Sequence, residues 1–201
     1  MFYRPDAPDH GLPHNPFKAI VSPRPIGWIS TADADGMANL APYSFFNALC
    51  DTPPMVMFAS SGAKPDQTKG KDSLANILAT KVFAVNIVSY ALREPMNKTA
   101  ASLGADEDEF AAAGLTKAAG VAINAPHVAE APAVLECKLF KVIDLLGAAN
   151  SMVIGEVVGV HIKDDFIVNG RFDVTRYKPL SRLGYMDYAA VENVFELVKP
   201  A

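Results

Sequence analysis

The chain has 201 residues, of which 50% are hydrophobic and 20% charged, and its formal net charge at pH 7 is −4. This apolar fraction is large enough to bury a core, which excludes a wholly disordered chain. The 18 basic and 22 acidic residues form no basic stripe, which argues against nucleic-acid binding. No apolar run approaches the ~20 residues of a membrane-spanning helix, and the first residues lack the apolar core of a secretion signal. We therefore expect a cytoplasmic globular protein with neither nucleic acid nor membrane as a partner.

The N-terminal part of the chain predicts an arm followed by a β-hairpin. Four prolines within residues 1–18 exclude a continuous helix and favour an extended arm. The β-forming runs 25–31 and 37–46 flank an Asp-Gly turn within 33–36, which is a strong hairpin signal. Pro42 lacks the N–H that a ladder needs, so we expect a bulge, an edge strand or a loop there.

A strand and a helix are predicted next. The short apolar run 54–59 is typical of a strand that is buried on both faces. After a polar loop, Asp72 can cap a helix, because apolar residues recur at spacings of three and four from Leu74 to Ile77 and Leu78.

The middle of the chain changes from strand to helix. Residues 82–88 predict an apolar strand. The Ala-rich stretch 90–118 is helical in character, with predicted breaks at Pro95, Gly104 and Gly114.

The C-terminal part is again rich in β-formers, in the runs 133–146, 151–163 and 166–168, while the tail 191–198 fits either a short helix or a strand. Strands thus predominate at both ends, without the strict alternation of a doubly wound parallel sheet. We predict a mainly β (α+β) fold, an antiparallel barrel with helical insertions, formed by residues 1–201 as one domain.

Standard catalytic and nucleotide-binding motifs are absent. There is no GxGxxG, GxxxxGK[ST], GxSxG or HExxH. The four histidines show no ligand-like spacing, and Cys50 and Cys137 lie too far apart for a zinc site. We expect no metal site and interpret both cysteines as buried thiols.

The predicted hairpin is the first candidate for chemistry. It places small hydroxyl and amide side chains beside the aromatic residues Trp28, Tyr43, Phe45 and Phe46. Either this surface hydrogen-bonds a polar ligand edge and covers a flat ring, or the aromatic side chains simply fill the barrel core.

Two further segments can be interpreted either as binding sites or as ordinary surface structure. In 69–77, a helix start with Lys71 and Ser73 suits a phosphate, whereas a capped surface helix with solvated lysines is the alternative. The negative charge of Asp72 disfavours binding of an anion there, unless the carboxylate caps the helix by accepting a hydrogen bond from a backbone N–H. The segment 178–188 holds an arginine, glycine and two tyrosines, and forms either a pocket or subunit contact or a surface turn.

Six motifs occur in a fixed order along residues 15–190: SPRPIGWIST, NLAPYSFFNALCDTPPMVMFA, KDSLANI with VFAVNIV, LECKLF, IGEVVGVHI and PLSRLGYMDY. Together they resemble the flavin reductase-like family of FMN-binding split-barrel proteins, often associated with flavoprotein oxygenases. The resemblance implies a six-stranded antiparallel split barrel with helical insertions. It also implies a homodimer with FMN at the subunit interface, and an oxygenase as a further partner.

The resemblance assigns cofactor-binding positions in three groups. The hairpin positions, for the ring and ribityl parts, are Trp28, Ile29, Ser30, Thr31, Asn39, Ala41, Pro42, Tyr43, Ser44 and Phe45. The positions near the phosphate end are Lys71, Asp72, Ser73 and Asn76, and those of the C-terminal turn are Arg182, Gly184 and Tyr188. Ser73 stands where the family often has Thr. Tyr185 stands where Gly is common, and we expect it to narrow the entrance.

The implied activity is transfer of hydride from NADH or NADPH to the flavin, and of electrons on to free flavin, oxygen or another acceptor. Because the flavin does the chemistry, we expect no dedicated nucleophile or acid–base pair and name no catalytic residue. His161 is the titratable group on a family-like strand, with either a chemical or a structural role. The alternatives are a non-catalytic FMN-binding carrier or sensor and a flavin-dependent oxygenase of a small organic substrate.

Overall fold

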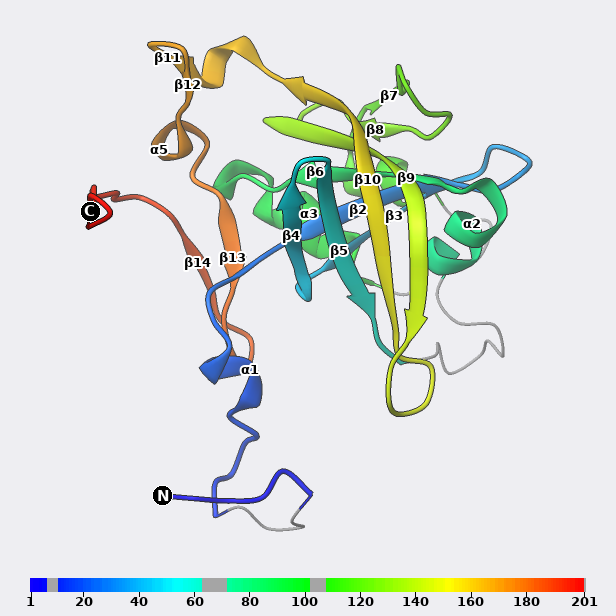
Figure 1. Ribbon diagram of the computed structural model, residues 1–201. Coiled ribbons are helices and arrows are strands. Elements are labelled where there is room, and N and C mark those ends of the chain that lie inside the picture. The colour runs from blue at the N-terminus through cyan, green and yellow to red at the C-terminus, as the bar shows by residue number, and fades with distance from the viewer. Residues whose placement is uncertain (7–10, 63–71, 102–107, 201) are drawn as a thin grey trace.

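The computed structural model describes residues 1–6, 11–62, 72–101 and 108–200 (Figure 1). Its main sheet is antiparallel, with the strand order β3-β2-β6-β9-β10-β5-β4. These strands are β2 (Gly27–Ala32), β3 (Ala38–Tyr43), β4 (Phe46–Asp51), β5 (Pro54–Ser60), β6 (Val82–Ile87), β9 (Ala133–Asp144) and β10 (Ser151–Ile162). In Figure 1, β4, β5, β10 and β9 lie in front and β2 and β3 cross behind them, as the sheet curls into a split barrel.

Shorter elements surround this sheet. The helices are α1 (Phe17–Ile20), α2 (Asp72–Thr80), α3 (Arg93–Lys98), α4 (Glu109–Ala113) and α5 (Val174–Tyr177), with 3-10 turns η1 (Tyr90–Leu92) and η2 (Asp164–Phe166). The small sheets pair β7 (Lys117–Ala118) with β8 (His127–Val128), β11 (Ile167–Val168) with β12 (Arg171–Phe172), and β1 (Arg24–Pro25) with β13 (Leu180–Arg182) and β14 (Tyr188–Ala190). Among the described residues, no helix is both long and apolar enough to span a membrane.

The predicted β-hairpin is confirmed. Strands β2 and β3 pair in register from Gly27 opposite Tyr43 to Ala32 opposite Ala38. The turn uses Gly36 at a φ of +87°, a conformation that glycine adopts without steric cost. Strand β3 lies at the edge of the sheet, which explains why it tolerates a proline.

Strand β2 is buried on both faces because two apolar clusters sandwich it. Trp28 packs with Phe110 of α4 in one cluster, and Ile29 packs with Phe83 and the α2 residue Ile77 in the other. Successive side chains of a strand point to opposite faces, so neighbours in sequence enter different clusters. Burying a large apolar side chain contributes about 1.5–3 kcal/mol, so these clusters fix the strand that carries the hairpin.

Several sequence-based expectations are wrong in detail. The sheet has seven strands rather than six because β4, a strand that was not expected, pairs with β5. Only one face of β5 is buried, since Val56 and Phe58 are buried while Met57 is half-buried. Pro95 does not break a helix, because it lies in the first turn of α3, where a backbone N–H has no intrahelical acceptor. The tail 191–198 is neither helix nor strand.

Two side chains expected inside the protein are exposed, and one predicted break is confirmed. Leu78 faces solvent at the outer side of α2, and Cys50 is exposed on β4, whereas Cys137 is buried; both thiols are free. Gly114 ends α4 with a φ of +71°, as expected of a helix-terminating glycine. Gly104 lies outside the described residues.

The N-terminal segment and the β13–β14 hairpin project together from the barrel (Figure 1). The buried guanidinium of Arg24 joins them, donating to the carbonyl oxygens of Lys18 and Val21 on one side and of Leu183 on the other. Burial lowers the pKa of Arg24, and the charge of Arg182 lowers it further. We name this projecting part, residues 11–25 and 180–190, the arm.

Candidate functional site

Two groups of predicted site residues meet in a small cavity between β3 and α2, which we name the β3–α2 cavity. Its volume is about 170 Å³. The predicted residues that line it are Asn39, Ala41, Pro42, Tyr43, Asp72 and Ser73, and the others are Thr99, Ala100, Ala101 and Glu109. The hairpin and the start of α2, which are distant in the sequence, thus form one wall.

Two side-chain hydrogen bonds fasten the first turns of α2 to the hairpin. Asn39 Nδ2 donates to Ser73 Oγ at 2.8 Å, and both residues are buried. Asn76 Nδ2 donates to Thr31 Oγ1 at 3.1 Å. The Ser73 hydroxyl accepts one bond here and keeps its own proton for a second. These bonds fix where α2 begins relative to β3 and therefore set the shape of the cavity.

Tyr43 supplies a buried hydroxyl on the same wall. Its ring packs against Phe58, with 4.7 Å between the ring centroids. Burial raises the pKa of Tyr43, hydrogen bonds with Ser73 and Ser60 act against that shift, and the charge of Asp72 adds to it. The phenol is therefore neutral near pH 7.

The other predicted residues of β2 have their side chains inside the protein. Trp28 Nε1 donates to Thr99 Oγ1 at 2.8 Å, and Ser30 Oγ donates to the carbonyl oxygen of Pro126 at 2.7 Å. Ile29 packs in the core. None of these three side chains lines the β3–α2 cavity, and their contact with a flavin stays a prediction.

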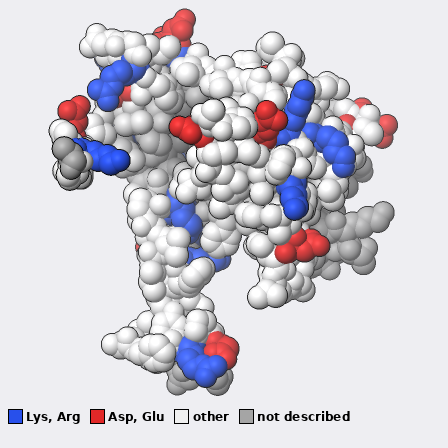
Figure 2. All heavy atoms as spheres, viewed as in Figure 1, with Lys and Arg blue, Asp and Glu red and all other residues white. Residues whose placement is uncertain are grey.

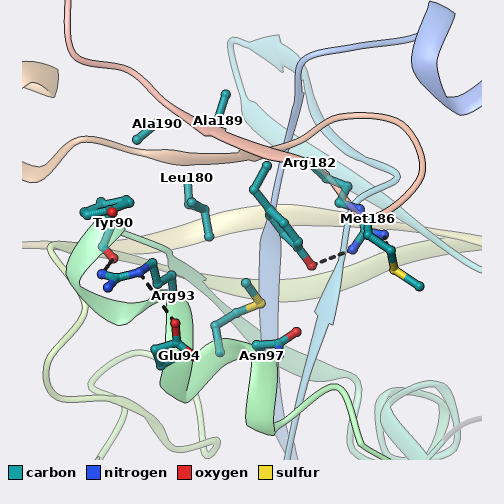
Figure 3. A pocket seen from close by; sticks show the side chains of 11 residues that line it. Tyr90, Arg93, Glu94, Asn97, Leu180, Arg182, Met186, Ala189 and Ala190 are labelled. Atoms are coloured by element: carbon teal, nitrogen blue, oxygen red, sulfur yellow. Dashed lines mark hydrogen bonds and ion pairs between the residues drawn. The ribbon is translucent and has the colours of Figure 1, made fainter.

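Two of the three C-terminal predicted residues, Arg182 and Tyr188 but not Gly184, line a second, larger cavity of about 390 Å³ between α3 and the β13–β14 hairpin, which we name the α3–β13 cavity (Figure 3). Arg182 donates to the Tyr188 hydroxyl and stacks over that ring, with 4.6 Å from its guanidinium carbon to the ring centroid. On the opposite wall, the Arg93 guanidinium lies 4.2 Å from the centroid of the Tyr90 ring. The wall of this cavity is thus built from arginines stacked on tyrosines.

Gly184 and Tyr185 shape the turn between β13 and β14. A Cβ atom on Gly184 would lie 2.4 Å from Ala19 Cβ, so a glycine is needed for the turn to pack on α1. Tyr185 has a φ of +55°, the left-handed region that favours glycine, which explains why glycine is common there in the family. Its ring is half exposed and contacts His14 instead of lining either cavity.

The predicted residues that line a cavity therefore form two groups, one in each cavity, and the end of α3 contributes to both cavities. Asn97 lines the α3–β13 cavity, and Thr99 lines the β3–α2 cavity. Ser44 and Phe45 lie in the bend between β3 and β4 and line neither. Lys71, the predicted phosphate-binding charge, lies outside the described residues.

Glu109 and Thr99 also contribute to the site, although no sequence pattern indicated them. Glu109 is buried beside the β3–α2 cavity, and no motif pointed to it. Thr99 accepts from Trp28 and donates to the Met96 carbonyl oxygen at 2.8 Å, and it fixes the end of α3 against β2. Only the tertiary fold brings these residues to the hairpin.

Comparisons with known proteins agree with this architecture. The family model described as "Flavin reductase like domain" matches residues 21–180. An uncharacterised protein from Aquifex aeolicus is 37% identical over 166 residues, 82% of this chain and 83% of its own. Nitrilotriacetate monooxygenase component B from Bacillus cereus is 30% identical with a TM-score of 0.88, and the match covers 98% of both chains. For 2-nitrobenzoate 2-nitroreductase from Pseudomonas fluorescens, identity is 31%, the TM-score 0.80, and coverage 92% of this chain and 88% of that one.

Proposed function

This chain belongs to the flavin reductase-like family, and from that premise we propose that it is an FMN-binding oxidoreductase of flavin reductase type. It takes hydride from NADH or NADPH and passes electrons to free flavin, oxygen or another acceptor. The match of the family's domain model to residues 21–180 carries the proposal. The β3–α2 cavity supports it, because hairpin and α2 positions predicted for the flavin adjoin there.

The residues of the β3–α2 cavity fit the sugar-alcohol chain of FMN. Ser73 and Tyr43 supply hydroxyl groups, and Asp72 of α2 and Glu109 of α4 also line the cavity. Ribityl hydroxyls both donate and accept hydrogen bonds, so they suit this mixed set. The two carboxylates repel a phosphate, which we therefore place beyond the cavity. Bound flavin supplies the hydride and electron chemistry, while these side chains bind and orient it.

The size of the cavity favours a site completed by a second copy of the chain. At about 170 Å³ it is smaller than the ~300–1,000 Å³ of typical small-molecule sites, so one chain encloses only part of a flavin. Large apolar side chains are also exposed elsewhere on the chain, with Leu49 on β4 and Phe17, Ile20 and Met186 on the arm. Figure 2 shows few charged side chains along the arm between the barrel and its tip. We propose a homodimer in which this apolar surface is covered and FMN lies at the interface.

The test of the proposed function is spectroscopic and kinetic. Purified protein is incubated with FMN, free flavin is removed, and the visible spectrum is recorded before NADH or NADPH is added. We expect retained flavin and steady nicotinamide oxidation at catalytic protein concentrations. Protein that stays colourless contradicts flavin binding. Retained flavin without turnover contradicts the reductase and favours a carrier or sensor, whereas an organic product carrying oxygen from O2 favours an oxygenase.

The assembly is tested separately by sedimentation velocity with and without FMN. We expect a dimer at the concentrations of the binding assay. A monomer that still binds FMN stoichiometrically contradicts the interface site but leaves the activity standing.

A further inference from the structure

Three ligand-type side chains meet at the end of the barrel formed by β8, β9 and β10. One potential ligand atom from each of His127, Glu136 and His161, a ring nitrogen or a carboxylate oxygen, lies within 4.8 Å of the other two. None of these residues lines the β3–α2 cavity or the α3–β13 cavity. The cluster is therefore separate from the candidate flavin site.

The register of β9 and β10 places two of the three side chains on one face. Glu136 pairs with Gly159, and His161 lies two positions further along β10, opposite Val134. Residues two apart on a strand share a face, so the carboxylate and the imidazole meet. A Cβ atom on residue 159 would lie 3.3 Å from Glu136 Oε2, and the glycine leaves room for the carboxylate.

The third side chain comes from β8, which is held in place on both sides of His127. The N–H of Val128 donates to Asn86 Oδ1 at 2.7 Å, and Ser30 Oγ donates to the Pro126 carbonyl oxygen at 2.7 Å. The two imidazole rings lie with their centroids 4.6 Å apart and their planes at 32°. The position of His127 beside His161 is thus set by buried contacts of β8 with β2 and β6.

Glu136 is fully buried and already oriented. Its Oε1 accepts from the N–H of Val121 at 2.7 Å, its Oε2 accepts from Ala122 at 2.6 Å and Ile123 at 3.1 Å, and His161 Nε2 lies 2.6 Å from Oε1. These hydrogen bonds hold both carboxylate oxygens of the buried side chain in place.

His127 provides an independent sign of a missing ligand. Its side chain is more than nine-tenths buried, and its Nδ1 has no hydrogen-bond partner among the described residues. Buried polar atoms in native proteins nearly always have a partner. A cavity of about 240 Å³ lined by both histidines adjoins the cluster. The exposed Lys163 also lines this cavity, but solvent screens its charge more than that of the buried carboxylate.

We propose that His127, Glu136 and His161 bind a borderline divalent cation of the Zn²⁺ type, with water at the remaining position. Two imidazoles and one carboxylate form a known zinc ligand set, and imidazole nitrogens disfavour Mg²⁺ and Ca²⁺. Metal–ligand distances of about 2.0–2.1 Å require donor atoms about 3.3 Å apart. His161 Nε2 and Glu136 Oε1, now 2.6 Å apart, therefore move apart to admit the ion, while the donor atoms that lie up to 4.8 Å apart move closer. An ion bound here ties β8 to β9 and β10.

The test measures metal binding by the full chain after chelator treatment and dialysis. Zn²⁺ is titrated calorimetrically and bound zinc is quantified by elemental analysis, with Co²⁺ as a visible probe. The variants are His161→Gln and His127→Gln, and the control is His14→Gln, which alters an exposed histidine of the arm. In His161→Gln the new amide can still donate to Glu136, so that the apo fold is preserved.

We expect about one Zn²⁺ per chain in the unaltered protein and in His14→Gln, with at least ~10-fold weaker binding in both cluster variants. Zn²⁺ should also raise the melting temperature of the unaltered protein and not that of His161→Gln. No zinc binding by the unaltered protein overturns the proposal. So does equal binding by folded cluster variants, which would assign zinc to other side chains.

Discussion

The hydrogen bond between Asn39 and Ser73 gives the sharpest test of how the candidate site is built. We consider Asn39→Ala, Ser73→Ala and the double variant. The bond is 2.8 Å long and buried, so its net contribution to the free energy of unfolding is about 0.5–1.5 kcal/mol. Each single variant leaves a buried partner unsatisfied and should lose about 1–3 kcal/mol. The double variant should lose less than the sum of the two single losses, with a coupling energy of about 1 kcal/mol.

Urea denaturation of the flavin-free protein measures all four free energies of unfolding. The matched control is Asn150→Ala, which removes an exposed hydrogen bond of 2.9 Å to the Leu146 carbonyl oxygen and should change stability by less than about 0.5 kcal/mol. If flavin lies in the β3–α2 cavity, the single variants should also bind FMN about 5–10-fold more weakly, the equivalent of about 1–1.4 kcal/mol. A coupling energy below about 0.3 kcal/mol would refute the reasoning, because the stability losses of two mutations at independent sites add to within about that amount.

Three further predictions concern the supports of the site. Gly155→Ala should cost about 1–3 kcal/mol in urea denaturation, because its Cβ would lie 2.4 Å from Phe83 Cζ, and Phe83→Leu in the same chain should recover part of that loss. Trp28→Phe should cost at least about 1–3 kcal/mol, because it leaves the buried Thr99 hydroxyl without its donor; a melting temperature equal to that of the unaltered protein would contradict this. Burial raises the pKa of Tyr43, so above about pH 10 the unfolded chain loses a proton that the folded chain keeps. The free energy of unfolding should therefore fall as pH rises, and denaturation in alkaline buffers should show a smaller fall for Tyr43→Phe.

Local signals in the sequence were sufficient where one turn or one run of residues decides the structure. The Asp-Gly turn predicted the β2–β3 hairpin, and the edge position of β3 is one of the three alternatives, bulge, edge strand or loop, that Pro42 left open. The strand β4 was not predicted, because its side chains are mostly exposed and show no alternation that a buried face would impose. Pro95 was interpreted as a break because its position within a helix cannot be known before the helix start is known.

Relationships between distant segments were beyond local reasoning. The resemblance to the family identified residues of the hairpin and of α2, but not that Trp28 and Ile29 face opposite cores while Asn39 lines a cavity. The sequence shows no ligand-like spacing among the histidines, yet the pairing of β9 with β10 and the contacts of β8 bring His127 and His161 together. Spacing along the sequence can reveal metal-ligating residues only where they lie on the same helix, strand or loop.

The position of the flavin tests the central claim most directly, and a crystal structure of the protein grown with FMN measures it. The account predicts flavin density against β3 and the start of α2, with the ribityl chain beside Asn39 and Ser73 and a second copy of the chain covering the ring. Flavin density confined to the α3–β13 cavity, with the β3–α2 cavity empty, would contradict it.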